Sequence, residues 1–350
     1  MSTTGSPVPE NDHREPFALG ACSRPLHEAH DLAMLDLDGV VYVGGHAVAH
    51  APESIAAARQ AGTGIAFVTN NASRTPEKVA AHLQELGIEA ATEDVVSSAQ
   101  AAAGVLRERF GAGARVVALG TAGLVEALRA VGLEPVGVED DADALATGYS
   151  PDVPWKDLMR GAVRVRQGLP WVASNTDMTI PTPYGVAPGH GVLVDMLRRF
   201  TEVEPVVAGK PAAPLLEETV RRVGGSTPLM IGDRLDTDID GGIAVGLPTL
   251  LVLTGVSGLD ELVATPAGHR PTYVAPDLRG LLAAHPEVSV DGASADCGGW
   301  TAVRDGAAVT VHGGGEPIAW WRAVLTVAWQ HLDETGEAVG TDGLVPPAAD

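Results

Sequence analysis

The chain has 350 residues, of which 45% are hydrophobic and 19% charged, and its formal net charge is −22. This length exceeds one typical domain core, so we expect two domains with terminal extensions. The composition is that of a globular protein and not of a disordered or fibrous one. The negative charge, uninterrupted by any cluster of Lys or Arg, argues against nucleic acids and anionic membrane surfaces as partners.

The cysteines and the N-terminus predict a cytoplasmic protein. Cys22 and Cys297 lie far apart and are not flanked by metal-ligand spacing, so neither a disulfide framework nor a zinc site is indicated. Residues 1–27 are polar and Pro-rich, without the basic start and apolar stretch of a signal peptide. No run of 18 apolar residues occurs elsewhere. We expect residues 1–27 to form a flexible segment.

From Asp31 onward, short apolar runs alternate with amphipathic segments, which is typical of a parallel sheet covered by helices. A helix is predicted over 79–86, because Thr75 offers an N-cap, Pro76 stands at the first position and Gly87 follows the end. Beyond Pro286 the sequence is rich in Gly and Trp and predicts one strand (308–312) and one helix (318–332). The strands predicted before it are 32–35, 65–69, 116–119, 171–174, 206–208, 229–232, 250–253 and 272–274.

Two acidic residues, Asp36 and Asp38, follow the first predicted strand, and Gly39 allows a tight turn behind them. Ligands collect at the carboxyl ends of strands in open α/β sheets. Asp36 can attack a phosphoryl group as nucleophile. Asp38 can protonate the leaving alkoxide and then activate the water that hydrolyses the intermediate. A plain Asp-rich turn is the alternative interpretation.

The ends of two further strands carry groups suited to phosphate. The hydroxyl of Thr69 and the main-chain N–H groups of Asn70 and Asn71 can hold phosphate oxygens, although an ordinary strand-ending turn is the alternative. Lys210 is one of only three lysines and follows the strand 206–208. Its ammonium can face both the phosphate and the nucleophile, whereas a solvated surface lysine is the alternative.

An acidic run after the strand 229–232 predicts a metal site. Asp233, Asp236 and Asp238 fall within six residues. Because Mg²⁺ binds few carboxylates and keeps several waters, Asp36, Asp233 and a main-chain oxygen near Asp38 would suffice to hold it. Asp238 would then orient Lys210 or a metal-bound water. A helix N-terminus stabilised by its dipole is the alternative, particularly for Asp236.

In chain order, the four strand ends that carry Asp36, Thr69, Lys210 and Asp233 resemble the motifs of the haloacid dehalogenase superfamily. The resemblance extends over about residues 31–282 and is specifically to the phosphatases of that superfamily with a class II cap. The resemblance implies a Mg²⁺-dependent phosphomonoester hydrolase that passes through an aspartyl-phosphate. A second aspartate two residues after the nucleophile indicates a phosphatase, since a dehalogenase does not need that acid. The implied roles are nucleophile for Asp36, acid and base for Asp38, phosphate ligands for Thr69 and Asn70, charge neutralisation for Lys210 and metal ligand for Asp233.

About 140 positions separate Thr69 from Lys210. In this superfamily such an insertion is a cap domain that closes over the substrate. The implied fold class is α/β, with a Rossmann-like doubly wound parallel-sheet core (28–112 and 205–285), an inserted α/β cap (113–204) and a small C-terminal appendage (286–350).

Segments of the cap and of the core carry a closer resemblance. Segments 174–181 and 188–191 resemble signatures of the NagD-like subfamily, which implies a specificity contact near Thr179 and Ile180. We interpret His190 as a residue that shapes a turn. A C-terminal extension and segments 67–74, 120–124, 207–212, 232–239 and 251–256 look like the bacterial glycerol-3-phosphate phosphatases of this subfamily. That implies sn-glycerol 3-phosphate as substrate, in glycerophospholipid recycling.

Other functions share parts of this pattern. A phospho-acceptor receiver module also combines Asp, Thr, Lys and Mg²⁺, but it lacks an acid two residues after the acceptor and has no cap insertion. A phosphatase for pyridoxal phosphate, nucleotides or sugar phosphates shares every core motif and differs only in the cap. For the appendage, two interpretations are open: its tryptophans pack on the core, or they form a homodimer (Trp300, Trp320, Trp321 and Trp329).

Overall fold

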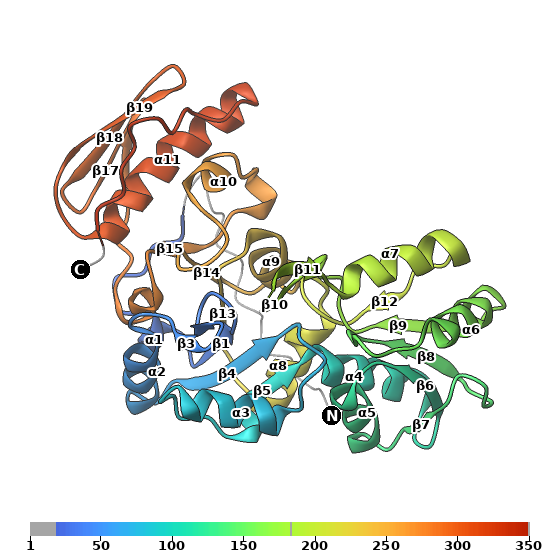
Figure 1. Ribbon diagram of the computed structural model, residues 1–350. Coiled ribbons are helices and arrows are strands. Elements are labelled where there is room, and N and C mark those ends of the chain that lie inside the picture. Colours follow the sequence, from blue (N-terminus) through green and yellow to red (C-terminus); the bar gives the residue numbers. More distant parts are fainter. Residues whose placement is uncertain (1–18, 183, 349–350) are drawn as a thin grey trace, which may run out of the picture.

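The computed structural model describes residues 19–182 and 184–348, which form a core, a cap and a C-terminal appendage (Figure 1). Residues 1–18 of the segment predicted to be flexible (1–27) lie outside the described residues. Residues 19–27 belong to the core. Leu19 and Leu26 are buried, and the main chain of Cys22 forms a β-bridge with His285.

The core contains a six-stranded parallel sheet with strand order β15-β14-β13-β1-β4-β5. The chain leaves the central strand β1 toward one edge and later returns to build the other edge, so the sheet is doubly wound. The order reverses between β1 and β13, and ligands bind at such a point in open α/β sheets. The strands are β1 (Leu32–Asp36), β4 (Gly64–Thr69), β5 (Val95–Ser97), β13 (Pro228–Gly232), β14 (Thr249–Val252) and β15 (Tyr273–Ala275).

Helices cover both faces of this sheet, which is why its strands are apolar throughout. Alternate residues of β1 point to opposite faces. Ala33 and Leu35 pack with α2 and α3, whereas Leu32 and Met34 pack with α4 and α8. The helix predicted after Thr75 is confirmed as α3. The larger core helices are α2 (Ala51–Gln60), α3 (Pro76–Glu85), α4 (Ser98–Phe110) and α8 (Pro214–Val223).

Short elements complete the core. Among them, β2 and β3 form a small antiparallel pair just after the first acidic turn. These elements are α1 (Leu26–Ala29), β2 (Tyr42–Val43), β3 (His46–Ala47), η1 (Thr92–Asp94), η2 (Leu235–Ile239), α9 (Asp240–Ala244), α10 (Leu259–Val263), η3 (Ala267–His269) and η4 (Leu278–Leu282).

The cap is inserted between β5 and β13 and contains a second parallel sheet, with order β12-β9-β8-β6-β7. The predicted return to the core at residue 205 falls just before β12, which belongs to the cap sheet. A hydrophobic cluster runs from β1 through α4 into β6 and α5, so core and cap share buried surface. The cap elements are β6 (Arg115–Leu119), α5 (Ala122–Ala130), β7 (Glu134–Val136), β8 (Ala144–Thr147), α6 (Trp155–Arg166), β9 (Trp171–Ala173), β10 (Thr179–Thr182), β11 (Gly185–Pro188), α7 (His190–Thr201) and β12 (Val206–Val207).

The appendage is a four-stranded antiparallel sheet covered by one long helix, where the sequence predicts a single strand and that helix. The sequence does not predict β16, β17 or β18; β16 and β17 have only three and four residues, too few to show a clear period. Trp320, Trp321 and Trp329 of the helix are buried with Leu251 and Val274 of the core sheet, so these tryptophans pack on the core and are not available to a partner. The elements are β16 (Ser289–Asp291), β17 (Ser294–Cys297), β18 (Trp300–Asp305), β19 (Ala308–Gly313) and α11 (Pro317–Thr335).

Candidate active site

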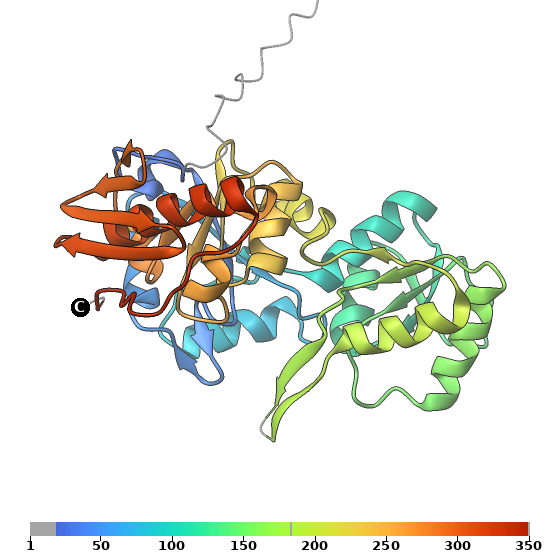
Figure 2. The same cartoon turned by 90° about the horizontal axis from the view of Figure 1, so that it is seen from above.

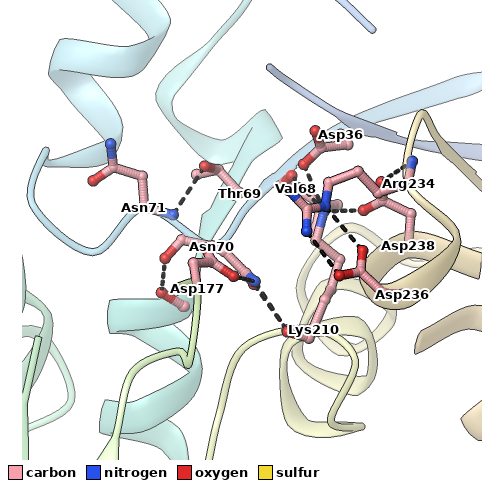
Figure 3. Close-up of polar contacts among 11 residues, drawn as sticks. Asp36, Val68, Thr69, Asn70, Asn71, Asp177, Lys210, Arg234, Asp236 and Asp238 are labelled. Carbon is pink, nitrogen blue, oxygen red and sulfur yellow. Dashed lines mark hydrogen bonds and ion pairs between the residues drawn. The ribbon is translucent and has the colours of Figure 1, made fainter. Parts of the chain in front are cut away.

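Three neighbouring strands of the core deliver the predicted polar residues to one edge of the sheet. Asp36 is the last residue of β1, Thr69 is the last residue of β4, and Asp233 follows β13 directly. Because β1 pairs in parallel with both β4 and β13, their carboxyl ends meet. This edge is the reversal point of the winding. Figure 3 labels Asp36 and Thr69 at this edge, together with Lys210 and Asp238.

Lys210 connects two carboxylates at this edge. Its Nζ lies 2.6 Å from Asp36 Oδ1 and 2.7 Å from Asp238 Oδ1 (Figure 3). Its side chain is only 2% exposed, which excludes the solvated surface lysine. Burial alone would lower the pKa of Lys210, but the ion pairs with Asp238 and Asp36 outweigh burial and raise it. The ammonium is therefore charged at neutral pH.

Three acidic residues form a cluster around this ammonium. Asp36, Asp233 and Asp238 each place a carboxylate oxygen within 4.8 Å of the others. Burial raises the pKa of Asp36 well above its usual range, with Lys210 opposing and the two other acids reinforcing the rise. Burial and the neighbouring Asp238 raise the pKa of Asp233 to about 6. With all three carboxyl groups ionised, one lysine would leave this buried cluster with excess negative charge, and this repulsion contributes to the raised pKa values of Asp36 and Asp233.

Asp233 has the donor atom that a cation requires. Its Oδ2 accepts the N–H of Val256 at 2.8 Å, whereas its buried Oδ1 has no hydrogen-bond partner among the described residues. Gly39 has φ +89°, and a Cβ there would crowd the Asp233 carboxylate, so the first acidic turn requires glycine. A buried, unpaired carboxylate oxygen beside two more carboxylates suits a hard cation such as Mg²⁺. The residues present therefore fit the predicted metal.

Asp236 and Asp238, the two other acids of the run after β13, lie in different surroundings. Asp238 is 1% exposed and belongs to the π-helical turn η2, and such turns are frequent at functional sites. Its position suits both contact with Lys210 and binding of a cation. Asp236 is 64% exposed and pairs with Arg234 at 2.7 Å, so it lies outside the carboxylate cluster.

Asp38 is exposed, whereas Asp36 is half-buried. Partial desolvation by the surrounding protein raises the pKa of Asp38, while the charges of Arg74 and Lys210 oppose the rise. A raised pKa favours the protonated form, which a general acid must have before it donates.

The residues after β4 form a tightly bonded loop. Thr69 Oγ1 accepts the N–H of Asn71 at 3.1 Å, and Asn71 Oδ1 accepts from Ser73. Asn70 is buried, and its amide nitrogen donates to Lys210 O at 3.0 Å and to Asp177 Oδ1 at 2.9 Å. Its amide oxygen accepts the N–H of Lys210 at 2.8 Å. The side chain of Asn70 therefore joins three segments of chain and is already occupied.

Comparison with known proteins identifies the family. Residues 33–134 match the family described as haloacid dehalogenase-like hydrolase, and residues 207–281 match a HAD-hydrolase-like family. A D-glycerol 3-phosphate phosphatase of Mycobacterium tuberculosis is 42% identical over 317 residues, which cover 88% of each chain. The chain belongs to the haloacid dehalogenase superfamily. Within that superfamily it is a class IIA, NagD-like phosphomonoesterase.

A solved structure and a second relative support this assignment. A glycerol phosphate phosphatase from M. tuberculosis, solved in complex with magnesium, has a TM-score of 0.80 at 42% identity and covers 88% of this chain and 92% of its own. The 5'-nucleotidase YutF of Bacillus subtilis is 34% identical over 247 residues, 70% of this chain and 94% of its own. Within the described residues of this haloacid dehalogenase phosphatase, no helix is long and apolar enough to cross a bilayer.

The predicted cap residues of this haloacid dehalogenase phosphatase are less closely tied to the cluster. Thr179 is exposed and Ile180 is half-buried in β10, whose hairpin with β11 projects beside the junction of core and cap (Figure 2). Among the described residues, neither side chain forms a hydrogen bond or ion pair with the carboxylate cluster. His190 is buried, its Nδ1 lies 2.8 Å from Asn175 O, and burial lowers its pKa to about 4. It is therefore a neutral structural histidine.

Sequence reasoning gave no role to two cap residues that reach the core. Asp177 accepts from Asn70, and burial raises its pKa against the charge of Lys210. Asn175 Nδ2 donates to Asn70 O at 2.7 Å. The sequence does contain an indication of their role. Both residues belong to a polar run directly after the predicted strand 171–174, and similar polar runs follow β1 and β4.

Proposed function

We propose that Asp36, Asp38 and Lys210 carry out the phosphomonoester hydrolysis. The observation that supports these roles is the pairing of Asp36 with Lys210 at the end of β1, two residues before an exposed acid of raised pKa. Asp36 attacks phosphorus as the ester bond breaks, and Asp38 donates its proton to the departing alkoxide oxygen. Asp38 then takes a proton from the water that attacks the aspartyl-phosphate. Phosphate leaves and Asp36 is regenerated.

The metal and phosphate contacts are part of the same proposal. Asp36, Asp233 and the main-chain oxygen of Asp38 would hold Mg²⁺, which when bound supplies positive charge for the phosphate oxygens. Thr69 would donate its hydroxyl hydrogen to the phosphate. Because the side chain of Asn70 is occupied, we assign it, together with Asn71, a contribution from the main chain.

For the substrate, we propose a glycerol phosphate. The support is the M. tuberculosis glycerol phosphate phosphatase, which is similar along both core and cap. The sequence resemblance implies sn-glycerol 3-phosphate, whereas the name of one relative specifies D-glycerol 3-phosphate, which is its mirror image. The similarity to a 5'-nucleotidase favours a nucleotide as the second candidate. Thr179 and Ile180 are kept as candidate specificity contacts.

A phosphate-release assay over small phosphate monoesters tests this function. The panel includes both glycerol phosphate enantiomers, a nucleoside monophosphate, a sugar phosphate and pyridoxal phosphate, each with Mg²⁺ and with a chelator. We expect the highest kcat/KM for one glycerol phosphate enantiomer. A higher value for a nucleotide would replace the proposed substrate, and phosphate release that persists undiminished in chelator would contradict the metal site.

The domain division, location and assembly are also proposals. We keep the core, cap and appendage boundaries, with residue 207 as the end of the cap, because β12 pairs with β9. The free thiols of Cys22 and Cys297 support a cytoplasmic location. A homodimer is supported by three exposed apolar residues spaced by four along α6, Trp155, Met159 and Val163. Sedimentation of the wild-type protein and of Met159→Glu tests this assembly.

A further inference from the structure

The loop 254–258 holds the metal-facing carboxylate of Asp233. Val256 donates its N–H to Asp233 Oδ2 at 2.8 Å, and Ser257 donates its N–H to the main-chain oxygen of Asp233 at 3.0 Å. A Cβ at Gly255 would collide with Oδ2, so the carboxylate lies directly on the loop main chain. These contacts fix one oxygen of Asp233 and leave Oδ1 for the carboxylate cluster.

The same loop is bonded to the two other acidic segments of the site. Thr254 donates its hydroxyl to Gly39 O at 2.6 Å, directly behind Asp38. Ser257 Oγ accepts the N–H of Leu235 at 3.2 Å, at the start of η2. A shift of the loop 254–258 would therefore displace both segments that carry the proposed metal ligands, 36–38 and Asp233, together with the start of η2.

The helix α10 follows this loop at once and is fastened to the appendage. With five residues it is too short to be stable without tertiary contacts. Trp329 of α11 is 1% exposed and donates Nε1–H to Leu262 O at 2.7 Å. Thr341 donates to the carboxylate of Asp260. Figure 1 shows α10 between α11 and the core sheet.

A second contact strengthens this attachment. Arg270, beyond α10, forms two hydrogen bonds with Asp333 of α11, at 2.7 and 2.8 Å. Its guanidinium also lies 4.9 Å from the centroid of the Trp329 ring, at cation–π distance. The segment 259–270 is thus held to the appendage from both ends.

We propose that the C-terminal appendage is a positioning element for the metal site. Trp329 fixes α10, α10 fixes the loop 254–258, and that loop sets the carboxylate of Asp233. Trp329 touches neither substrate nor metal and acts through Asp233. This inference rests on the proposed binding of Mg²⁺ by the carboxylate cluster.

Trp329→Phe in the full chain tests the proposal, because Phe keeps an aromatic ring beside Arg270 and removes only the indole N–H and part of the ring. A single hydrogen bond contributes about 0.5–1.5 kcal/mol, so we expect the Mg²⁺ dissociation constant, measured calorimetrically without substrate, to rise roughly 2- to 13-fold. Turnover should recover at saturating Mg²⁺, with an unchanged KM for the phosphate ester.

The matched control is Trp321→Phe, which alters an indole of the same helix that stacks edge-to-face on Trp320 at 5.1 Å. In the described part of the chain, Trp321 forms no hydrogen bond with α10, so its loss should lower stability and leave Mg²⁺ affinity unchanged. If Trp329→Phe does not fold, Thr341→Val removes the other contact to α10 and should also weaken Mg²⁺ binding.

Two results would overturn the proposal. A wild-type Mg²⁺ dissociation constant in both Trp329→Phe and Thr341→Val would make the appendage a stabilising unit only. If the wild-type protein itself binds no Mg²⁺, the carboxylate cluster is not a metal site, and the inference falls with it. The first result leaves the proposed function intact, whereas the second does not.

Discussion

Replacing Asp233 by Asn should stabilise the metal-free protein at pH 8 while it weakens Mg²⁺ binding. Asp233 is 1% exposed, its Oδ1 has no partner among the described residues, and burial holds its pKa at about 6. Ionising this carboxyl in the fold, with a pKa about two above the ordinary value near 4, costs roughly 3 kcal/mol. Asn keeps an oxygen for the N–H of Val256 and removes that cost.

The pH dependence follows from the direction of this pKa shift. Between about pH 4 and pH 6 the folded metal-free protein binds more protons than the unfolded chain, so its stability falls as pH rises through that window. Above pH 6 the cost of the buried charge is fully present. The stability advantage of Asp233→Asn should therefore be largest at pH 8 and nearly absent at pH 4.

Urea unfolding in EDTA at both pH values measures this difference. Asp291→Asn is the matched control. Asp291 is an exposed acid of β16, and replacing it removes one negative charge from the net charge of −22, as Asp233→Asn does. An Asp233→Asn variant that is less stable than wild type at pH 8 would refute the reasoning. So would an advantage shared by Asp291→Asn, since general charge repulsion would then explain it.

Three further changes probe the chemistry. Asp38→Asn should slow the first step with glycerol phosphate by about 10²–10⁴, because an alkoxide must be protonated as it leaves. With p-nitrophenyl phosphate the initial burst should fall far less, because p-nitrophenolate leaves without needing a proton. Equal losses of first-step rate for the two esters in rapid-quench measurements would remove Asp38 from the acid role. Calcium should inhibit, because its looser coordination lets Asp36 bind through both oxygens and leaves none to attack; activation equal to that by magnesium would contradict this site. Ile180→His should change relative kcat/KM values among phosphate esters at unchanged Mg²⁺ affinity, and an unaltered profile would move the specificity contact elsewhere in the cap.

The ends of the central strands could be predicted from the sequence because each apolar run stops at a polar residue. Asp36, Thr69 and Asp233 occupy such positions, and a parallel sheet brings them together. The sequence does not predict strand β8, because Thr147 is the only β-branched residue among its four positions. Strand β5 has only three residues, and the exposed β16 also has three, so neither presents a clear period.

Contacts between distant segments could not be predicted. The sequence predicts a phosphate contact for the main-chain N–H of Asn70, but it does not predict that the Asn70 side chain bonds to Asp177 and Lys210, which are 107 and 140 positions away. Likewise, Trp329 and Leu262 are 67 positions apart. Neither composition nor periodicity specifies which buried donor meets which acceptor, since that choice depends on how helices and loops pack after the sheet has formed.

The insertion of the cap between the two halves of the core sheet sets an order of events during synthesis. Strand β1 pairs with β4 on one side, but its other neighbour, β13, begins 159 residues after β4 ends. At ribosomal rates of roughly 5–20 residues per second, one edge of β1 waits on the order of 10–30 s for its partner. All five strands of the cap sheet emerge in that interval. Until β13 is synthesised, the nascent chain therefore exposes one unpaired, apolar side of its central strand β1. Such an exposed strand edge can aggregate.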